Sequence, residues 1–268
     1  MYGIFDSHAH YDDEAFREDR DALLQSLPGQ GICGVINCAS DLPTALESVA
    51  LAERYPFAFA AVGIHPHEAA KAPADWKEQL CALAGNPKVV AVGEIGLDYH
   101  YDFSPRDRQK QLLIEQLAFA KEHGLPVILH DREAHGDMME ILRKARPKGV
   151  MHCFSGSVEL MRETVALGMY IGLGGAVTFK NARVPVEVAR EVPLDRLLLE
   201  TDCPYMTPVP FRGKRNDSTF LPLTAEKIAA ERGMDAQALV DQCRKNTCAL
   251  FDIPESSLLY MTESERQL

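Results

Sequence analysis

Residues 89–130 read VVAVGEIGLDYHYDFSPRDRQKQLLIEQLAFAKEHGLPVILH, and this stretch decides the fold class. A short apolar run at each end flanks a polar segment whose leucines recur at helical spacing. Ser104 and Pro105 predict the start of a helix, and Gly124 predicts its end. Apolar runs bounded by Gly or Pro are typical of strands that are buried on both faces of a parallel sheet. The stretch therefore predicts a strand–helix–strand unit.

The same alternation of apolar run and amphipathic segment recurs along the chain. The eight apolar runs are residues 4–5, 34–38, 58–62, 89–92, 126–129, 149–151, 170–173 and 197–199. Eightfold alternation favours a single (β/α)8 TIM barrel over an open sheet, and no Gly-x-Gly-x-x-Gly motif follows an early strand. Helical spacing predicts two last helices, at 224–232 and 235–251. We expect one catalytic barrel domain, residues 1–254, and a polar C-terminal tail, residues 255–268.

The composition is that of a globular enzyme with an acidic balance. Of 268 residues, 46% are hydrophobic and 25% charged, and 39 acidic against 28 basic residues give a net charge of −11. This balance argues against tight, sequence-independent binding of a polyanion, because such binding relies on Lys and Arg. It does not exclude a phosphate substrate, since bound cations can dominate the local field of a site.

The sequence also indicates a cellular compartment. No apolar run approaches the roughly 20 residues that span a bilayer. The first residues, MYGIFDSHAH, lack the basic and apolar regions of a signal peptide. The seven cysteines are scattered, without a Cys-x-x-Cys pair, unlike a disulfide framework or a thiolate zinc site. We expect a cytoplasmic protein without membrane contact and without an obligate protein partner.

Histidines and carboxylates gather where the predicted strands end, which is where a (β/α)8 barrel builds its active site. The residues that close six of the runs are His8, His10, His65, Glu94, His130, His152 and Asp202. His8 and His10 are two positions apart, so on a strand both imidazoles point to the same face. Histidines and carboxylates that converge on one opening, with no cations among them, indicate a metal site.

The number of candidate ligands predicts two divalent cations. These ligands are His8, His10, Glu94, His130, His152 and Asp202. Six exceed the need of one tetrahedral catalytic ion that must keep an open position. They suit two ions with a bridging carboxylate. Imidazole with carboxylate favours transition metals over a pure oxygen site, and zinc, manganese, magnesium and nickel all stay open because ligand type alone does not decide.

Six sequence blocks carry a family resemblance. They are HAH at 8–10, GIHPH at 63–67, GEIGLDYH at 93–100, PVILHDREAH at 126–135, MHCFSGS at 151–157 and ETDCPYMTP at 200–208. In this order they resemble the signature blocks of the TatD-like metal-dependent deoxyribonucleases, relatives of the amidohydrolases. The resemblance covers the chain from about residue 4 to residue 251. It implies one ion held by His8, His10 and Asp202, a second held by His130 and His152, and Glu94 as the bridge.

One segment departs from the family pattern. Where an Arg-Asn-Glu-Pro-like stretch is expected after the eighth strand, this chain reads Arg215-Asn216-Asp217-Ser218. The carboxylate is shorter by one methylene and the proline is lost. The departure concerns the rigidity of this loop and its contact with substrate, and leaves the metal ligands unaffected.

The metals imply hydrolysis, and the resemblance implies DNA as the substrate. We expect an enzyme that cleaves phosphodiester bonds, acting at single-stranded ends because a barrel mouth admits a strand end more easily than a duplex. We expect Asp202 to orient and deprotonate the attacking water, with Glu94 as the second catalytic carboxylate. The alternative for Asp202 is pure ligation.

Substrate contacts are predicted in the loops after the seventh and eighth strands, where such barrels often bind phosphate. The candidate basic residues are Lys180, Arg212 and Arg215; the alternative is an ordinary solvated loop. His65 is a candidate donor to the substrate phosphate, or else a packed, hydrogen-bonded histidine. Asp98 and His100 are candidates for the opposite rim, or ordinary polar loop residues. Such a small patch predicts weak and local binding of DNA.

Two other functions stay open. The first is hydrolysis of a small amide, ester or lactone, as in the wider amidohydrolase group, although many of those enzymes use a carboxylated lysine where this chain has Glu94. The second is a non-catalytic binding module on a relict barrel, which would be free to lose metal ligands. This chain keeps all six of its candidates.

Overall fold

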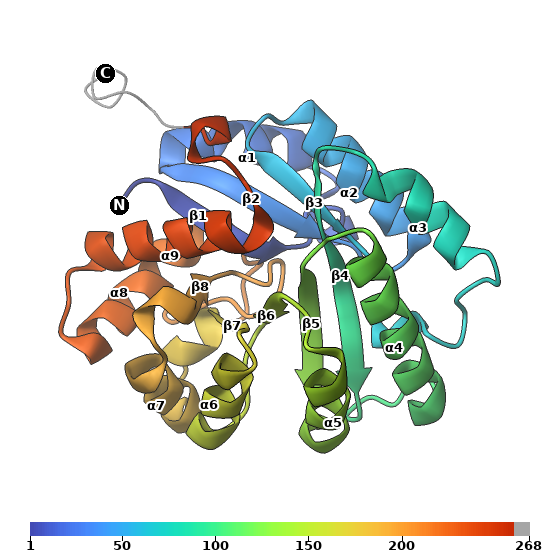
Figure 1. Cartoon of the computed structure of the whole chain (residues 1–268). Coiled ribbons are helices and arrows are strands. Elements are labelled where there is room, and N and C mark those ends of the chain that lie inside the picture. Colours follow the sequence, from blue (N-terminus) through green and yellow to red (C-terminus); the bar gives the residue numbers. More distant parts are fainter. Residues whose placement is uncertain (260–268) are drawn as a thin grey trace.

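The computed structural model describes residues 1–259. Within them, eight parallel strands form one sheet whose order follows the chain from β1 to β8. The strands are β1 Ile4–Ala9, β2 Ile32–Cys38, β3 Ala58–Val62, β4 Val89–Asp98, β5 Val127–Arg132, β6 Gly149–Met151, β7 Tyr170–Leu173 and β8 Leu197–Leu199. The strands lie at the centre of the molecule and the helices surround them (Figure 1).

The sheet closes where the first strand meets the segment that follows the last. A parallel bridge joins Ala9 to Cys203. The backbone N–H of Asp202 donates to the His8 carbonyl at 3.0 Å, and that of His10 donates to the Cys203 carbonyl at 2.8 Å. The predicted (β/α)8 barrel is thereby confirmed.

The helices of the outer layer alternate with the strands. They are α1 Arg20–Ser26, α2 Leu42–Arg54, α3 Trp76–Ala84, α4 Arg106–Glu122, α5 His135–Ala145, α6 Val158–Ala166, α7 Arg183–Glu191, α8 Leu221–Arg232 and α9 Ala236–Phe251. Short 3-10 helices lie at Glu14–Phe16, Pro28–Gln30, Pro66–Glu68, Gly175–Thr178, Leu194–Arg196, Ser218–Phe220 and Glu255–Ser257. Of these helices, none among residues 1–259 is long and apolar enough to cross a membrane.

Helix α9 begins as the sequence predicts, whereas α4 and α8 begin at other residues. Asp235 caps α9 as predicted, because its carboxylate accepts from the Ala238 N–H at 2.9 Å. The helix after β4 begins at Arg106, one residue later than predicted, because Pro105 has an extended ψ of 134° and is itself the cap. Helix α8 begins at Leu221, before the predicted 224, because a proline fits its first turn.

The strands extend further than their apolar runs. All six residues of β1 and all ten of β4 are buried, although β1 continues through Asp6 and His8 and β4 through Glu94 to Asp98. These polar side chains therefore stand inside the barrel or at its carboxyl end. A buried polar group must be hydrogen-bonded, paired or bound to a metal, so their contacts define the chemistry of the protein.

The expected polar tail is described only in part, and residues 260–268 lie outside the described residues. The chain before them continues to pack on the barrel: Leu258 is buried, and the Leu259 N–H donates to the Cys33 carbonyl at 3.1 Å. The domain boundary at residue 254 stays a prediction.

Candidate metal centre

The structure brings the six candidate ligands together at the carboxyl ends of the strands. His8, Glu94 and His130 stand on β1, β4 and β5. His10 and His152 directly follow β1 and β6, and Asp202 is the third residue after β8. Five of them line a cavity of about 740 Å³ in the barrel mouth, here called the mouth cavity. His8 is fully buried beside them.

One group of donor atoms consists of His8 Nε2, His10 Nε2, Glu94 Oε2 and Asp202 Oδ1. The two imidazole nitrogens lie 3.0 Å apart. Glu94 Oε2 lies 3.3 Å from His8 and 3.5 Å from His10. Asp202 Oδ1 lies 3.7 Å from His8 and 3.4 Å from His10. A tetrahedral ion with bonds near 2.0–2.1 Å has donor–donor edges of about 3.4 Å. The five spacings that involve a histidine, 3.0 to 3.7 Å, are close to that length.

A second group forms around the other oxygen of Glu94. His130 Nδ1 lies 2.8 Å from Glu94 Oε1, and His152 Nε2 lies 2.7 Å from it. The two imidazole nitrogens are 3.5 Å apart. Because Oε2 faces the first group and Oε1 faces the second, Glu94 stands where a bridging carboxylate would stand. His65, Glu94 and His130 also lie close enough together to hold a metal ion. The His65 Nε2 lies 3.5 Å from Glu94 Oε1.

The charges of the cluster call for cations. Burial alone would raise the pKa of Glu94, but the charges of His152 and its neighbours hold that pKa well below its usual value. Burial lowers the pKa of His10, yet the hydrogen bond to Asp202 and the charge of Glu94 raise it to about 10. The buried His10 ring therefore binds a proton in spite of its burial, because the carboxylates beside it are negatively charged. Divalent cations would balance the same charge.

The second nitrogens of two histidines are held by acceptors behind the site. His10 Nδ1 lies 2.8 Å from the Cys38 carbonyl, and His130 Nε2 lies 3.1 Å from Asp98 Oδ2. Such partners orient metal-binding imidazoles. Asp98, predicted as a rim or loop residue, is fully buried at the end of β4 and also contacts His67 at 3.0 Å. His100 instead pairs with Glu133 on the surface, at 2.8 Å.

The backbone is strained at Cys153, next to the candidate ligand His152, and at the candidate ligand Asp202. Cys153 has φ 43° and Asp202 has φ 57°, in the left-handed region that costs a non-glycine residue on the order of 1–3 kcal/mol. Asp202 is held by its N–H bond to β1, and the Cys153 N–H donates to the buried Glu200 carboxylate. Sequence reasoning missed Glu200; its place directly after β8, two residues before Asp202, was the available signal.

His65 is the one predicted substrate contact that lines the mouth cavity. Its Nδ1 accepts a hydrogen bond from the His67 N–H at 3.2 Å. Burial lowers the pKa of His65 to about 4, so the ring is neutral at pH 7. A neutral imidazole whose Nδ1 is an acceptor carries its proton on Nε2. This nitrogen can therefore donate to an anion in the cavity.

The three predicted basic residues lie away from the mouth cavity. Arg215 pairs with Asp19 through two bonds of 2.7 and 2.6 Å. Arg212 stacks over the Phe179 ring with its Cζ at 3.8 Å from the centroid, and Lys180 lines a separate outer cavity beside α7. Among the described residues that line the mouth cavity, Arg132 is the one Lys or Arg side chain. Sequence reasoning missed it, although Arg132 is two positions after His130 on the same strand.

The loop that departs from the family pattern is anchored by polar contacts. Asn216 is buried, and its Nδ2 donates to the carbonyls of Thr201 and Tyr205 at 3.0 and 2.7 Å. Ser218 Oγ donates to Asp6 Oδ2 at 2.6 Å. The serine in place of proline thus ties the loop after β8 to β1, beside the ligands.

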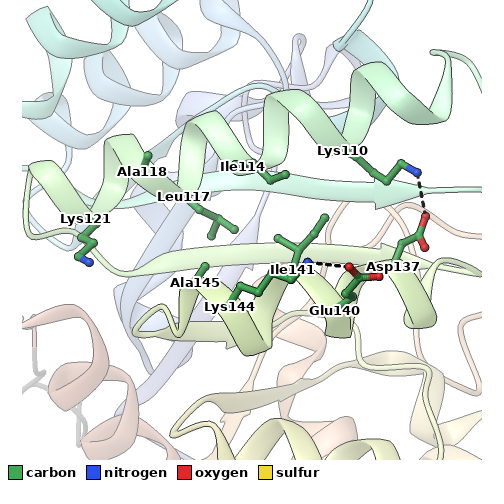
Figure 2. Close-up of a pocket in the computed structure, with 10 residues that line it drawn as sticks. All are labelled: Lys110, Ile114, Leu117, Ala118, Lys121, Asp137, Glu140, Ile141, Lys144 and Ala145. Carbon is green, nitrogen blue, oxygen red and sulfur yellow. Dashed lines mark hydrogen bonds and ion pairs between the residues drawn. The ribbon is translucent and has the colours of Figure 1, made fainter.

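A second cavity, of about 610 Å³, lies in the outer layer between α4 and α5 (Figure 2). Its floor is apolar, with Ile114 and Ile141, and its rim holds paired charges such as Lys144 and Glu140 at 2.7 Å. Its described lining contains no histidine. The metal chemistry therefore belongs to the mouth cavity.

A closed (β/α)8 barrel with these donor groups at its carboxyl end defines a class, the TIM-barrel metal-dependent hydrolases. The family model of the TatD-related DNases matches residues 5–252. The chain belongs to this family.

Its relatives extend over nearly the whole chain. The uncharacterized metal-dependent hydrolase YabD of Bacillus subtilis is 40% identical over 253 residues, which are 93% of this chain and 99% of YabD. The 3'-5' ssDNA/RNA exonuclease TatD of Escherichia fergusonii is 34% identical, over 93% of this chain and 99% of that protein.

Solved structures agree with the fold. The TatD homologue YjjV of Escherichia coli superposes with a TM-score of 0.89 at 36% identity, covering 94% of this chain and 98% of YjjV. The phosphotriesterase homology protein of Escherichia coli, solved with phosphate in its active site, is 16% identical with a TM-score of 0.64, so it shares the fold alone.

Proposed function

We propose that the protein is a divalent-metal-dependent deoxyribonuclease that hydrolyses phosphodiester bonds at the ends of single-stranded DNA. The observation that carries this proposal is the position of Glu94, whose two oxygens face two separate groups of donor atoms. Membership of the TatD-related DNase family supports it, and so does the similarity to the 3'-5' ssDNA/RNA exonuclease of Escherichia fergusonii.

The six ligands would hold two cations in the arrangement that the donor groups suggest. His8, His10 and Asp202 would hold one, His130 and His152 the other, with Glu94 between them. The chemistry that a pair of divalent cations supplies is Lewis-acid polarisation of the phosphoryl group and a lower pKa for water. Zinc, manganese, magnesium and nickel are all compatible with this donor set.

The protein's own groups would move the proton and hold the phosphate. Asp202 is the more open of the two carboxylates, with 18% of its side chain exposed against 5% for Glu94. Asp202 therefore orients the attacking water and accepts its proton. Both oxygens of Glu94 are occupied by the two donor groups that they face. His65 donates from Nε2 to a phosphate oxygen, and Arg132 offers the permanent positive charge of the cavity wall.

The charges of the mouth cavity favour a strand end. The segments that follow β1, β2 and β3 contribute carboxylates to the wall: Asp12, Asp13, Glu14, Glu47 and Glu68. Arg132 comes from β5, on another part of the wall. A phosphate backbone that continued past the metals would meet these carboxylates, so a chain that terminates there is favoured. Binding is expected to be weak and local, because one arginine neutralises little of the backbone charge.

We further propose that the enzyme acts in the cytoplasm and needs no protein partner for activity. The seven cysteines are all free thiols, and five of them are buried. Free, mostly buried thiols are typical of proteins in a reducing compartment.

The test is a nuclease assay on end-labelled single- and double-stranded oligonucleotides with manganese, magnesium, zinc or nickel. We expect stepwise shortening of the single strand by the metal-loaded protein. Glu94→Ala and Asp202→Ala should abolish it, whereas the matched control Asp107→Ala, whose side chain is 97% exposed on α4, should not. Metal-loaded protein that leaves every form of DNA intact would overturn the proposal, and activity on a small amide, ester or lactone would then replace it.

A further inference from the structure

Two aromatic rings stand exposed at the edge of the mouth cavity. The loop between β4 and α4 carries Tyr101, which is 47% exposed and lines the cavity, and Phe103, which is 67% exposed. The rings stack on each other, with centroids 5.2 Å apart and planes 18° from parallel. Exposed apolar side chains that gather beside a polar cavity mark a binding surface more often than isolated ones do.

The pair is connected to the metal centre by a short chain of contacts. The His67 ring meets Phe103 edge-on at 4.8 Å and Tyr101 at 5.5 Å. His67 Nε2 lies 3.0 Å from Asp98 Oδ2, and the same oxygen lies 3.1 Å from His130. A group that covers the two rings would therefore lie directly beside a phosphate at the metals.

The loop is held in place without any ligand. Asp98 Oδ1 accepts from the Tyr101 N–H at 2.8 Å. The buried Gln109 side chain donates to the carbonyls of Asp98 and Ser104 at 3.1 and 2.8 Å. Arg106 pairs with Asp102 through bonds of 2.8 and 2.6 Å. Because the rings are already fixed, little conformational entropy would be lost when something stacks on them.

A positively charged side chain lies beside the two rings. The Arg132 guanidinium lies over the Tyr101 ring, with Cζ 4.8 Å from its centroid. Open aromatic faces next to a positive charge are how proteins bind single-stranded nucleic acid, since bases stack on the rings and phosphates pair with the cation. The carboxylates of the segments that follow β1 and β2 leave the side of the cavity with Tyr101 and Arg132 as the path for the strand.

We infer that Tyr101 and Phe103 form a stacking platform for a nucleobase of the single strand whose phosphate lies at the metal centre. The inference rests on the proposed function and adds to it a subsite for the base. The platform contacts the flat aromatic face that all bases share, so it accepts a DNA strand of any sequence. It requires a base that is not stacked and paired in a duplex.

The test compares intact strands with strands that lack one base. The substrates are end-labelled single-stranded oligonucleotides, intact or with one tetrahydrofuran abasic residue at each of the first four positions from the cleaved end. The enzymes are the metal-loaded wild type, Tyr101→Leu, Phe103→Leu and the double variant. Tyr2→Leu is the matched control, because Tyr2 is 50% exposed and precedes β1 at the opposite end of the barrel. Metal content and melting temperature confirm that each variant is loaded and folded.

We expect an abasic residue at one position to raise the KM of the wild type by about 5- to 150-fold, the range of one base–aromatic stack. The double variant should show a similar rise on the intact strand and no further rise on the abasic strand. Tyr2→Leu should behave as wild type.

Wild-type KM and wild-type abasic sensitivity in the double variant would overturn the platform and leave the nuclease intact. A change of oligomeric state in the double variant, with an unchanged KM, would overturn it as well and assign the rings to a protein contact. A wild type that cleaves no DNA would overturn the proposed function and the platform with it.

Discussion

Replacing Ser218 by Ala is expected to destabilise the protein, because the hydroxyl joins the loop after β8 to the first strand. Ser218 Oγ donates to Asp6 Oδ2 at 2.6 Å and accepts from the Tyr11 hydroxyl at 2.7 Å, and that hydroxyl accepts from the Ser218 N–H at 3.0 Å. All three residues are buried, at 0–1% exposure. Alanine removes two of the three bonds and leaves the Tyr11 hydroxyl without an acceptor.

The magnitude follows from the burial. One lost bond to a carboxyl group and one buried donor left without an acceptor cost on the order of 2–3 kcal/mol together, since Asp6 keeps the N–H and hydroxyl of Thr201. For a chain of 268 residues the entropy of unfolding is about 0.56 kcal/mol/K, so the melting temperature should fall by roughly 4–5 °C. The family-like substitution Ser218→Pro should cost more, because it also removes the N–H.

The assay is thermal and urea unfolding followed by circular dichroism. Ser26→Ala is the control, because Ser26 Oγ donates to a carbonyl on the exposed surface of α1, and its loss should shift stability by no more than about 0.5 kcal/mol. If Ser218→Ala melts at the wild-type temperature, the hydrogen bond to Asp6 does not hold this loop, and the departure from the family pattern has no structural consequence.

Three further predictions concern the site. Glu94→Gln should lower the content of both cations, measured by mass spectrometry after dialysis; loss of only one would contradict the bridging position. Asp98→Asn should lower kcat by about 10- to 100-fold through the orientation of His130, and unchanged kcat would contradict this. Arg132→Ala should raise the KM for single-stranded DNA and flatten its dependence on salt, whereas Arg215→Ala, whose charge Asp19 satisfies, should change neither; the reverse result would restore the basic patch predicted from the sequence.

The sequence predicts the barrel and the gathering of candidate ligands because both follow from local pattern. Apolar runs define parallel strands, and residues that close such strands must meet at one end of the barrel. The length of the strands is harder to predict. The apolar run at 89–92 ends six residues before Asp98, the last residue of β4, because polar residues at the site interrupt the apolar pattern. This is why the sequence pattern places Asp98 in the loop after the strand.

The position of the basic residues is hard to predict for a different reason. Whether an arginine in a loop is free for substrate depends on partners that are distant in sequence. Arg215 finds Asp19, 196 positions away, whereas Arg132 is left on the cavity wall over Tyr101. Composition and spacing carry no information on such pairings, so this part of the site became visible only in three dimensions.

The closure of the barrel between β1 and the segment after β8 also sets the time at which activity arises. Chains emerge from the ribosome N-terminus first, at about 5–20 residues per second. His8 and His10 are made early relative to Asp202, which follows 192 residues after His10 together with the bridge from Ala9 to Cys203. The nascent chain therefore has no complete set of candidate ligands until Asp202 has been made. A nuclease whose site spans this closure gains activity only after all eight strands have been made.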